Sequence, residues 1–464
     1  MSLRDADSAS GHVAIDGNDP FYRTPFRIGE TTAAVLGAVG VAASDLWRLR
    51  TGRPQSVAVA VNEAAATLRT VDYSARRNER SGQYESLPIT APMAQMLTVT
   101  QPWPTLDGRW FLPHLNLPHL SRRVLNVLGC ENTPESVAAA VGRRRADELE
   151  QAIADAQACG GTIRTPEEWL QHPQGRYLSA RPVVEIHKIA DGAPQPLPNG
   201  DRPLSGVRVL DLTRILAGPV AGRTLAEQGA DVLMVTAGKL PQTPEHVRDT
   251  SHGKRSCFLD LDLPDEAQQL RRLVREADVF IDGYRPGALQ GHGFGAQELH
   301  ALRPGLVVLS VSCFGSGGPF AGRAGWEQVA QAVTGICHVN GQLSNGGRPK
   351  LVFAPMSDYI TGYLGAYGVM LALARRAREG GSYQVHVSLC QSAMFVHRQG
   401  LLAGFEDAPE RLDDASLQRL YVQAATSQGE LRTLGPVLKM SETMPRWSRP
   451  TPAFGADEPC WLPR

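Results

Sequence analysis

The sequence has no excess of either charge and few aromatic residues. Its 464 residues include 47 Lys and Arg, 47 Asp and Glu, and 6% Phe, Trp and Tyr. A chain without net charge creates no field that would recruit a nucleic acid or an anionic membrane. We therefore expect no nucleic acid and no membrane as a partner, and a small ligand with local charges fits better. The length predicts two or more domains.

Metal-binding motifs, disulfide patterns and long apolar runs are also missing. The seven cysteines are scattered, odd in number and without CxxC or Cys/His spacing, so we expect reduced core thiols and no metal. The first 20 residues are polar and lack the apolar core of a signal peptide. We find no stretch long enough to span a bilayer. These features favour a cytoplasmic location.

Strand-like apolar runs alternate with amphipathic helices after residue 205. Helices are expected near 221–229 and 265–277, and the strands are expected at 207–212, 230–235, 256–261, 278–283 and 306–312. Continuous β-rich runs separated by helices predict an α/β fold with a parallel sheet covered on both faces, a Rossmann-like layout. No GxGxxG motif follows the first strand, which counts against a dinucleotide dehydrogenase.

One segment of the chain resembles another at a distance of 328 residues. Residues 36–65 align without a gap onto 364–393, and eleven identities fall between 30–65 and 358–393, Gly37/Gly365 and Val57/Val385 among them. Two unrelated Ala/Gly-rich helices, each followed by a strand, would give part of this match. The alignment places Glu30 opposite Asp358.

Asp358 is the one acid of the stretch APMSDYITGY, between the apolar run LVFAPM and an Ala/Gly-rich segment. The periodicity predicts a helix over 359–378 that begins just after this residue. Asp is a preferred N-cap, so a structural cap is one interpretation. The other is a reactive carboxylate placed at the positive end of a helix.

Several motifs together resemble a known family. They are PLSGVRVLDLTRILAGPVAGRTLAEQGADVLMV, GKRSCFLDL, ADVFIDGYRPGAL, LVVLSVSCFGSGGPFAGRAGWE and APMSDYITG, over about 203–396. In this order they resemble the class III CoA-transferases, which include carnitine CoA-transferase, formyl-CoA transferase and α-methylacyl-CoA racemase. The resemblance implies a Rossmann-like large domain, a smaller helical or α+β domain, and a homodimer of interlocked chains.

The resemblance continues upstream in an altered order, as in a rearranged or partial tandem fusion. The segments DGRWFLPHLNLPHLSRRVLNVLG and TPEEWLQHP look like the family's small domain, which normally follows the large-domain segment. The expected organisation is an extended tail (1–20), a partial degenerate copy of the large-domain segment (21–95), the small domain (96–186), a Pro/Gly-rich linker (187–203), the large domain with the CoA site (204–400) and a C-terminal segment returning to the large domain (401–464).

The resemblance also implies a reaction and its residues. Acyl-CoA and a carboxylic acid would be the substrates, and Asp358 would be the nucleophile that carries first the acyl group and then CoA. An ordinary carboxylate stays ionised near pH 7 without a general base. Glu327 matches a second acidic position, where it would orient substrate or face solvent. Contacts to CoA, or ordinary turn and surface roles, are expected at Arg214, Ile215, Ala217, Lys254, Gly283, Tyr284 and Arg285.

Departures from the family pattern leave alternatives open. The chain has VLMVTAG where the family usually has VIKVE, so a basic contact to CoA is lost. Trp326 stands where the racemases carry a proton-transferring histidine, which argues against racemisation. Glu30 is one methylene longer than an aspartate, so we interpret the first copy as structural. The alternatives to transfer are a CoA-thioester racemase, isomerase or lyase, and an inactive CoA-binding or scaffold protein.

Overall fold

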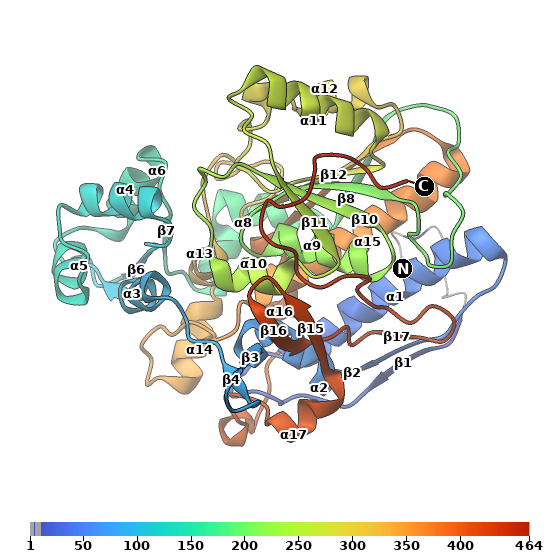
Figure 1. Ribbon diagram of the computed structural model, residues 1–464. Coiled ribbons are helices and arrows are strands. Elements are labelled where there is room, and N and C mark those ends of the chain that lie inside the picture. Colours follow the sequence, from blue (N-terminus) through green and yellow to red (C-terminus); the bar gives the residue numbers. More distant parts are fainter. Residues whose placement is uncertain (1–3, 5–10, 464) are drawn as a thin grey trace.

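A seven-stranded sheet organises the large domain of the computed structural model, which describes residues 4 and 11–463 (Figure 1). The strands lie in the order β11-β10-β9-β12-β13-β14-β8, and only the edge strand β8 is antiparallel to its neighbour. Their bounds are β8 Glu185–Ala190, β9 Arg208–Leu212, β10 Asp231–Thr236, β11 Lys254–Phe258, β12 Val279–Asp282, β13 Val307–Ser312 and β14 Ser382–Ser388. The α/β prediction with a parallel sheet is confirmed.

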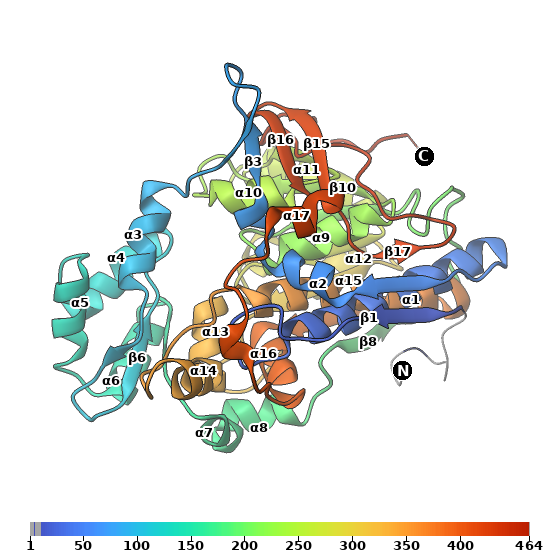
Figure 2. The same cartoon turned by 90° about the horizontal axis from the view of Figure 1, so that it is seen from below.

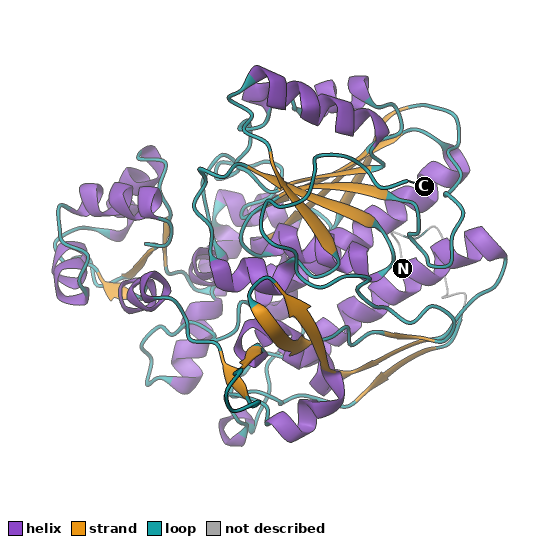
Figure 3. Ribbon diagram, viewed as in Figure 1, coloured by secondary structure: helices purple, strands orange, loops and turns teal. Residues whose placement is uncertain are grey.

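Helices cover both faces of this sheet (Figures 1 and 3). Along β9, Val209 packs into the core shared with α9 and α15, whereas the next residue, Leu210, packs into the core shared with α11 and α12. This alternation explains the continuous apolar runs, because both faces of each strand are buried. The helices of the large domain are α9 Ala217–Glu227, α10 Pro244–Thr250, α11 Pro264–Glu276, α12 Ala296–Leu302, α13 Glu327–Thr334, α14 Ile336–Ser344, α15 Met356–Glu379 and α16 Leu389–Arg398.

The strand order reverses between β9 and β12. The six parallel strands follow the order 3-2-1-4-5-6 of a doubly wound fold, in which ligands bind beyond the carboxyl ends of the strands at the reversal point. The loops that follow β9 and β12 therefore define the edge where a ligand is expected.

Residues 13–73 repeat a piece of this architecture. Helix α1 (Ile28–Thr51) and helix α15 each have 24 residues, begin 328 residues apart and pack against each other (Figure 2). Each is followed by a glycine with positive φ, a conformation without steric cost for a residue that lacks Cβ. The rest of the segment is β1 Val13–Asp16, β2 Val57–Ala60, α2 Val61–Ala66 and the 3-10 helix Thr67–Tyr73.

Helix α1 corrects one expectation. By length and composition it is long and apolar enough to cross a membrane, although no such stretch was found in the sequence. Most of its apolar window is buried inside the fold, where Val39 and Leu46 join the large core. The helix is apolar on most sides because it packs against both α15 and the small sheet formed by β1, β2 and β17 (Lys439–Met440).

A smaller unit stands apart from the sheet in both views of the cartoon (Figures 1 and 2). It has its own core, which includes Phe111, Val124 and Leu149. Its elements are α3 Ala91–Val99, β5 Trp103–Pro104, β6 Trp110–Pro113, α4 Pro118–Leu128, α5 Pro134–Val141, α6 Ala146–Asp155 and β7 Gly160–Thr162, and α7 Pro166–Gln171 and α8 Pro173–Ser179 lead back to the sheet.

The predicted linker and the predicted N-terminal tail both contain β-strand residues. Residues 187–190 belong to β8, so the linker prediction is wrong there: the Pro/Gly-rich composition begins only after this edge strand. Part of the predicted tail is also a strand, β1, and residues 1–3 and 5–10 lie outside the described residues. The remaining elements are β3 Ala75–Arg77, β4 Tyr84–Ser86, α17 Asp414–Leu417, β15 Tyr421–Thr426, β16 Gly429–Leu434, β17 Lys439–Met440 and three further short 3-10 turns.

The final residues lie along the large domain. The backbone N–H of Ser256 in β11 donates to Asp457 Oδ2 at 2.8 Å, and Trp461 Nε1 donates to the carbonyl of Leu273 in α11 at 3.0 Å. The last segment thereby covers the outer edge of the sheet next to β11, which protects the unpaired side of that strand.

Candidate active site

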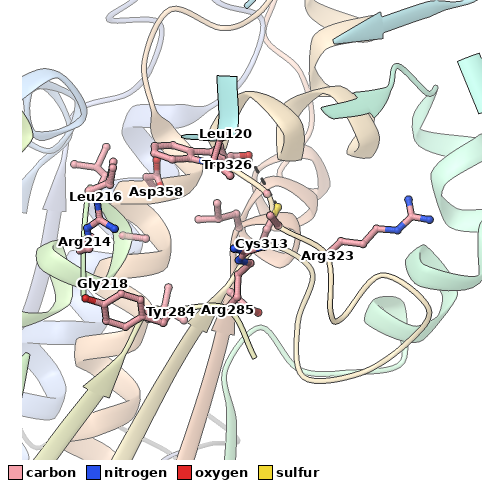
Figure 4. A pocket seen from close by; sticks show the side chains of 18 of the residues that line it. Leu120, Arg214, Leu216, Gly218, Tyr284, Arg285, Cys313, Arg323, Trp326 and Asp358 are labelled. Carbon is pink, nitrogen blue, oxygen red and sulfur yellow. Dashed lines mark hydrogen bonds between the residues drawn. The ribbon is translucent and has the colours of Figure 1, made fainter. Parts of the chain in front are cut away.

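A cavity of about 250 Å³ opens at the reversal point of the sheet (Figure 4). The loop after β9, the loop after β12 and the start of α15 form its walls. Six of the seven residues predicted to contact CoA line it, together with Asp358: they are Arg214, Ile215, Ala217, Gly283, Tyr284 and Arg285. The resemblance and the fold therefore lead to the same edge of the sheet.

The seventh residue, Lys254, lies elsewhere, and its prediction as a CoA contact is wrong. Its side chain is 0% exposed, and Nζ donates to Asp211 Oδ2 at 2.6 Å and to the carbonyl of Pro219 at 2.7 Å. Burial of this carboxylate without a cation would be costly, so the lysine neutralises it. The motif GKRS thus marks a structural ion pair that holds β9, β11 and α9 together.

The turn after β9 brings a backbone donor to Asp358. Ile215 has φ +76°, a conformation that β-branched residues rarely adopt, and α9 begins two residues later. The N–H of Ala217 in the first turn of α9 donates to the Asp358 carboxyl. Gly362 allows the close approach of α9 and α15, because a Cβ there would lie 2.6 Å from the Ala217 oxygen.

Asp358 is not the N-cap of its helix. Helix α15 begins at Met356 with Pro355 in the cap position, so Asp358 lies inside the first turn and the cap interpretation is wrong. The residue is 9% exposed, and that exposure faces cavities on two sides. Its carboxylate is therefore accessible only to a ligand that enters one of them.

Glu327 supplies the cap that Asp358 does not. The Asp358 N–H donates to Glu327 Oε2 at 2.8 Å, and Gln331 Nε2 donates to Glu327 Oε1 at 2.8 Å. The backbone N–H of Ser357 is a further donor. Glu327 is only 3% exposed, which rules out the interpretation that it faces solvent. Two carboxyl groups thus lie together at the N-terminus of α15.

Burial and mutual repulsion disfavour two negative charges at this point. Burial raises the pKa of Asp358 well above the range of an ordinary aspartate, and the Glu327 charge raises it further. Burial also raises the pKa of Glu327, to about 7, against the effect of its N–H donors. The expectation that Asp358 is ionised like an exposed carboxylate is therefore wrong. Since Glu327 accepts two hydrogen bonds, its charged form is better stabilised than that of Asp358.

Basic groups surround the outer part of the first cavity. Arg214 and Arg285 line it from the two loops, and His119 faces them from the small domain. Burial and these cations lower the pKa of His119, so the ring is neutral at pH 7. Arg323 also lines the cavity but extends away from Arg285 in Figure 4, and its guanidinium donates to Gln151 at 3.0 Å. This wall suits an anionic group such as a phosphate.

A second cavity, of about 580 Å³, lies on the other side of Asp358. It shares Asp358, Trp326, Ile215 and Leu216 with the first. Its other apolar walls come from the first copy, from α3 and from the segment before α15: they include Leu68, Val71, Ile89, Met93, Met96, Leu97, Leu351, Val352 and Phe353. Sequence reasoning missed this cavity because its walls are more than 250 residues apart. The apolar face of α3, left half-exposed at Met93, was the available signal.

Within residues 4 and 11–463, no group of three or more His, Cys, Asp or Glu side chains is placed to hold a metal ion. The polar groups that converge here are the Asp358–Glu327 pair, the Ala217 N–H and the arginines.

These features define a doubly wound α/β protein with a ligand cavity at the reversal point of its sheet and a buried carboxyl pair between two cavities. The family model of CoA-transferase family III matches residues 6–196 and 204–421. The chain belongs to this family of enzymes.

Two curated proteins and one solved structure illustrate what the chain is similar to. An acyl-CoA transferase of Gibberella moniliformis is 31% identical over 95% of this chain and 89% of that protein. The succinate–glutarate CoA-transferase of Agrobacterium fabrum is 32% identical over 44% of this chain and 55% of that protein. The crystal structure of Rv3272 from M. tuberculosis is 30% identical over 43% of this chain and 59% of that one, with a TM-score of 0.40. The chain thus spans most of the first relative but little more than half of the others.

Proposed function

We propose that the protein transfers CoA from an acyl-CoA to a second carboxylic acid, with Asp358 as the nucleophile. The observation that carries this proposal is the position of Asp358 at the wall common to a basic cavity and an apolar cavity. A thioester whose CoA part occupies the basic cavity has its carbonyl at this wall. The family assignment supports the same class of reaction.

The reaction would run through two kinds of covalent intermediate. Asp358 first loses its proton to solvent, and one oxygen of the ionised carboxylate then attacks the thioester carbonyl. The C–S bond breaks and CoA thiolate leaves, which gives a mixed anhydride. The thiolate then attacks the Asp358 γ-carbon and releases the donor carboxylate, which leaves an aspartyl-CoA thioester. The acceptor carboxylate repeats these steps in reverse order, and acyl-CoA of the acceptor departs. No net proton is consumed, because a carboxylate and a thioester exchange partners.

Glu327 has a positioning role in this scheme. By accepting the N–H groups of Ser357 and Asp358, it fixes the first turn of α15 and hence the direction of the Asp358 side chain. The Ala217 N–H, at the N-terminus of α9, donates to the carboxyl and would stabilise negative charge that develops on oxygen. Trp326 is no proton donor, so this site favours transfer over racemisation.

Trapping with hydroxylamine tests the proposal. The purified chain is incubated with a panel of acyl-CoAs and then with hydroxylamine, and the peptide that contains Asp358 is analysed by mass spectrometry. We expect a hydroxamate at Asp358 in the wild type and in Glu30→Gln, and none in Asp358→Asn. Binding of acyl-CoA without any adduct would overturn the proposal and favour an inactive CoA-binding protein.

The expected homodimer and the cytoplasmic location belong to the same proposal. Light scattering of the purified chain measures the first, and fractionation of the producing cells measures the second. A particle with the mass of one chain would overturn the homodimer, and recovery with the membrane fraction would overturn the location.

A further inference from the structure

We infer that the second cavity binds the acyl part of the thioester, and that it selects an uncharged, mainly hydrocarbon acyl group of medium length over short and over dicarboxylic ones. This inference rests on the proposed function and names its substrate class. It concerns residues outside the motifs that carry the resemblance, namely the 3-10 helix 67–73, α3 and residues 349–353.

The two cavities divide the ligand between them. Asp358 lines both, so a thioester carbonyl held at its carboxyl has the CoA sulfur on one side and the acyl carbons on the other. The arginines line the first cavity, which assigns CoA phosphates to that side. The acyl carbons must then extend past Trp326 and Leu216 into the second cavity.

The size and the lining of this cavity fit a hydrocarbon chain. About 580 Å³ is within the range of pockets that hold drug-sized ligands and far exceeds the need of an acetyl group. Val71, Met93 and Phe353 come from three separate walls, so the space is apolar on several sides. Methionine side chains are flexible and fill irregular gaps, which suits acyl chains of more than one shape.

The charges around the cavity disfavour a second carboxylate. Arg69 Nε already donates to Asp72 at 2.6 Å, and its guanidinium lies 4.8 Å from the Phe353 ring centre. Glu245 is buried in the wall and accepts the Thr90 N–H at 2.7 Å, which adds a negative charge. A carboxylate at the end of an acyl chain would therefore be repelled and would lack a new partner.

The two other basic side chains that line the cavity, His246 and Lys350, offer a second carboxylate no buried partner either. Burial lowers the pKa of His246, which keeps its ring neutral at pH 7. Lys350 also lines the cavity, but its side chain is exposed and remains hydrated. The interior of the cavity therefore has no cation that is both buried and uncommitted among the residues described for it.

A comparison of acyl-CoAs tests the inference. Rates of Asp358 acylation are measured with acetyl-CoA, octanoyl-CoA and suberoyl-CoA, the last having the same carbon number as octanoyl-CoA but a terminal carboxylate. We expect kcat/KM to be at least about tenfold higher for octanoyl-CoA than for either of the others. A preference for acetyl-CoA or suberoyl-CoA, with the adduct still on Asp358, would overturn this inference and leave the proposed function intact.

Variants locate the selectivity in the second cavity. Met93→Trp and Val71→Phe narrow it from two different walls, and both should lower kcat/KM for octanoyl-CoA at least about tenfold while acetyl-CoA changes less than about twofold. Ala94→Trp, on the exposed side of the same helix α3, is the matched control and should change neither. Circular dichroism confirms that each variant is folded. Equal losses for both thioesters in two folded variants would contradict the inference, and no adduct with any thioester would contradict the proposed function itself.

Discussion

The first turns of α15 and α1 have the same backbone geometry and the same kind of cap, but different residues surround them. The cap residues Pro355 and Arg27 have nearly identical backbone angles, φ −77° and −76° with ψ 58° in both. In α1 the N–H of Glu30 donates to Asp19 Oδ2 at 2.9 Å, as the N–H of Asp358 donates to Glu327. A carboxyl group, half-buried at Asp19 and buried at Glu327, thus caps each helix and leaves a second acid in its first turn.

The difference lies in what surrounds that second acid. Glu30 pairs with Arg27 at 2.8 Å and lines neither cavity, whereas Asp358 lines both. A cation stabilises the charge of Glu30, but burial and Glu327 raise the pKa of Asp358. Both helices therefore have a carboxyl pair at the N-terminus as part of the fold. Only the pair of α15 adjoins the two cavities, which makes it the candidate site.

Neutralising the two acids should give the largest contrast. Asp358→Asn removes the nucleophile, and we expect kcat/KM to fall at least about a thousandfold. Glu30→Gln leaves every group of the site in place and should change kcat/KM less than about twofold. Steady-state transfer rates measure both, and equal losses in the two variants would refute the distinction between the copies.

The capping acids should differ in their effect on pH dependence. The raised pKa of Asp358 predicts that activity falls in acid at a higher pH than an ordinary aspartate would give. Glu327→Gln removes the nearby charge, so the acid limb of the kcat/KM profile should shift to lower pH. The plateau value of kcat/KM should fall about tenfold, because an amide accepts the N–H groups less well than a carboxylate does. Asp19→Asn should leave the profile unmoved. An acid limb that stays in place in Glu327→Gln would mean that the pair is not coupled.

The same pKa shift has a consequence for stability. Between the unfolded pKa of about 4 and the raised folded pKa, unfolding releases the proton of Asp358, so wild-type stability declines as pH rises. Asp358→Asn removes this penalty, and its Tm should exceed that of the wild type at pH 8 and approach it below pH 4. Scanning calorimetry over this range checks the sign, and a Tm lower than wild type at pH 8 would contradict it.

Replacing an arginine near each acid should give the smallest difference between the two regions. Arg285→Ala should weaken CoA binding about twofold to fivefold at low salt and less at high salt, because the side chain is exposed and screened. Arg27→Ala, beside Glu30, should leave CoA binding unchanged. Isothermal titration with free CoA measures both affinities, and no effect of Arg285→Ala at low salt would remove it from the CoA contacts.

The sequence predicted the sheet and one cavity well because their signals are local. Apolar runs mark the strands, and TRILAGP and DGYRPG place residues directly after β9 and β12, where the reversal of strand order brings them together. Lys254 could not be judged in the same way, since its burial against Asp211 depends on packing between strands. The role of Glu327 and the second cavity depend on contacts between distant segments, and the apolar face of α3 alone does not identify the segments that it meets.

Transfer of oxygen-18 from a labelled acceptor carboxylate tests the nucleophilic role of Asp358 most directly. When the acceptor attacks the aspartyl thioester and CoA then attacks the acceptor carbonyl, one acceptor oxygen must remain on Asp358. After repeated turnover we expect the label in the peptide that contains Asp358 and none in the peptide that contains Glu30. Complete transfer of CoA with an unlabelled Asp358 would contradict a covalent step at this residue.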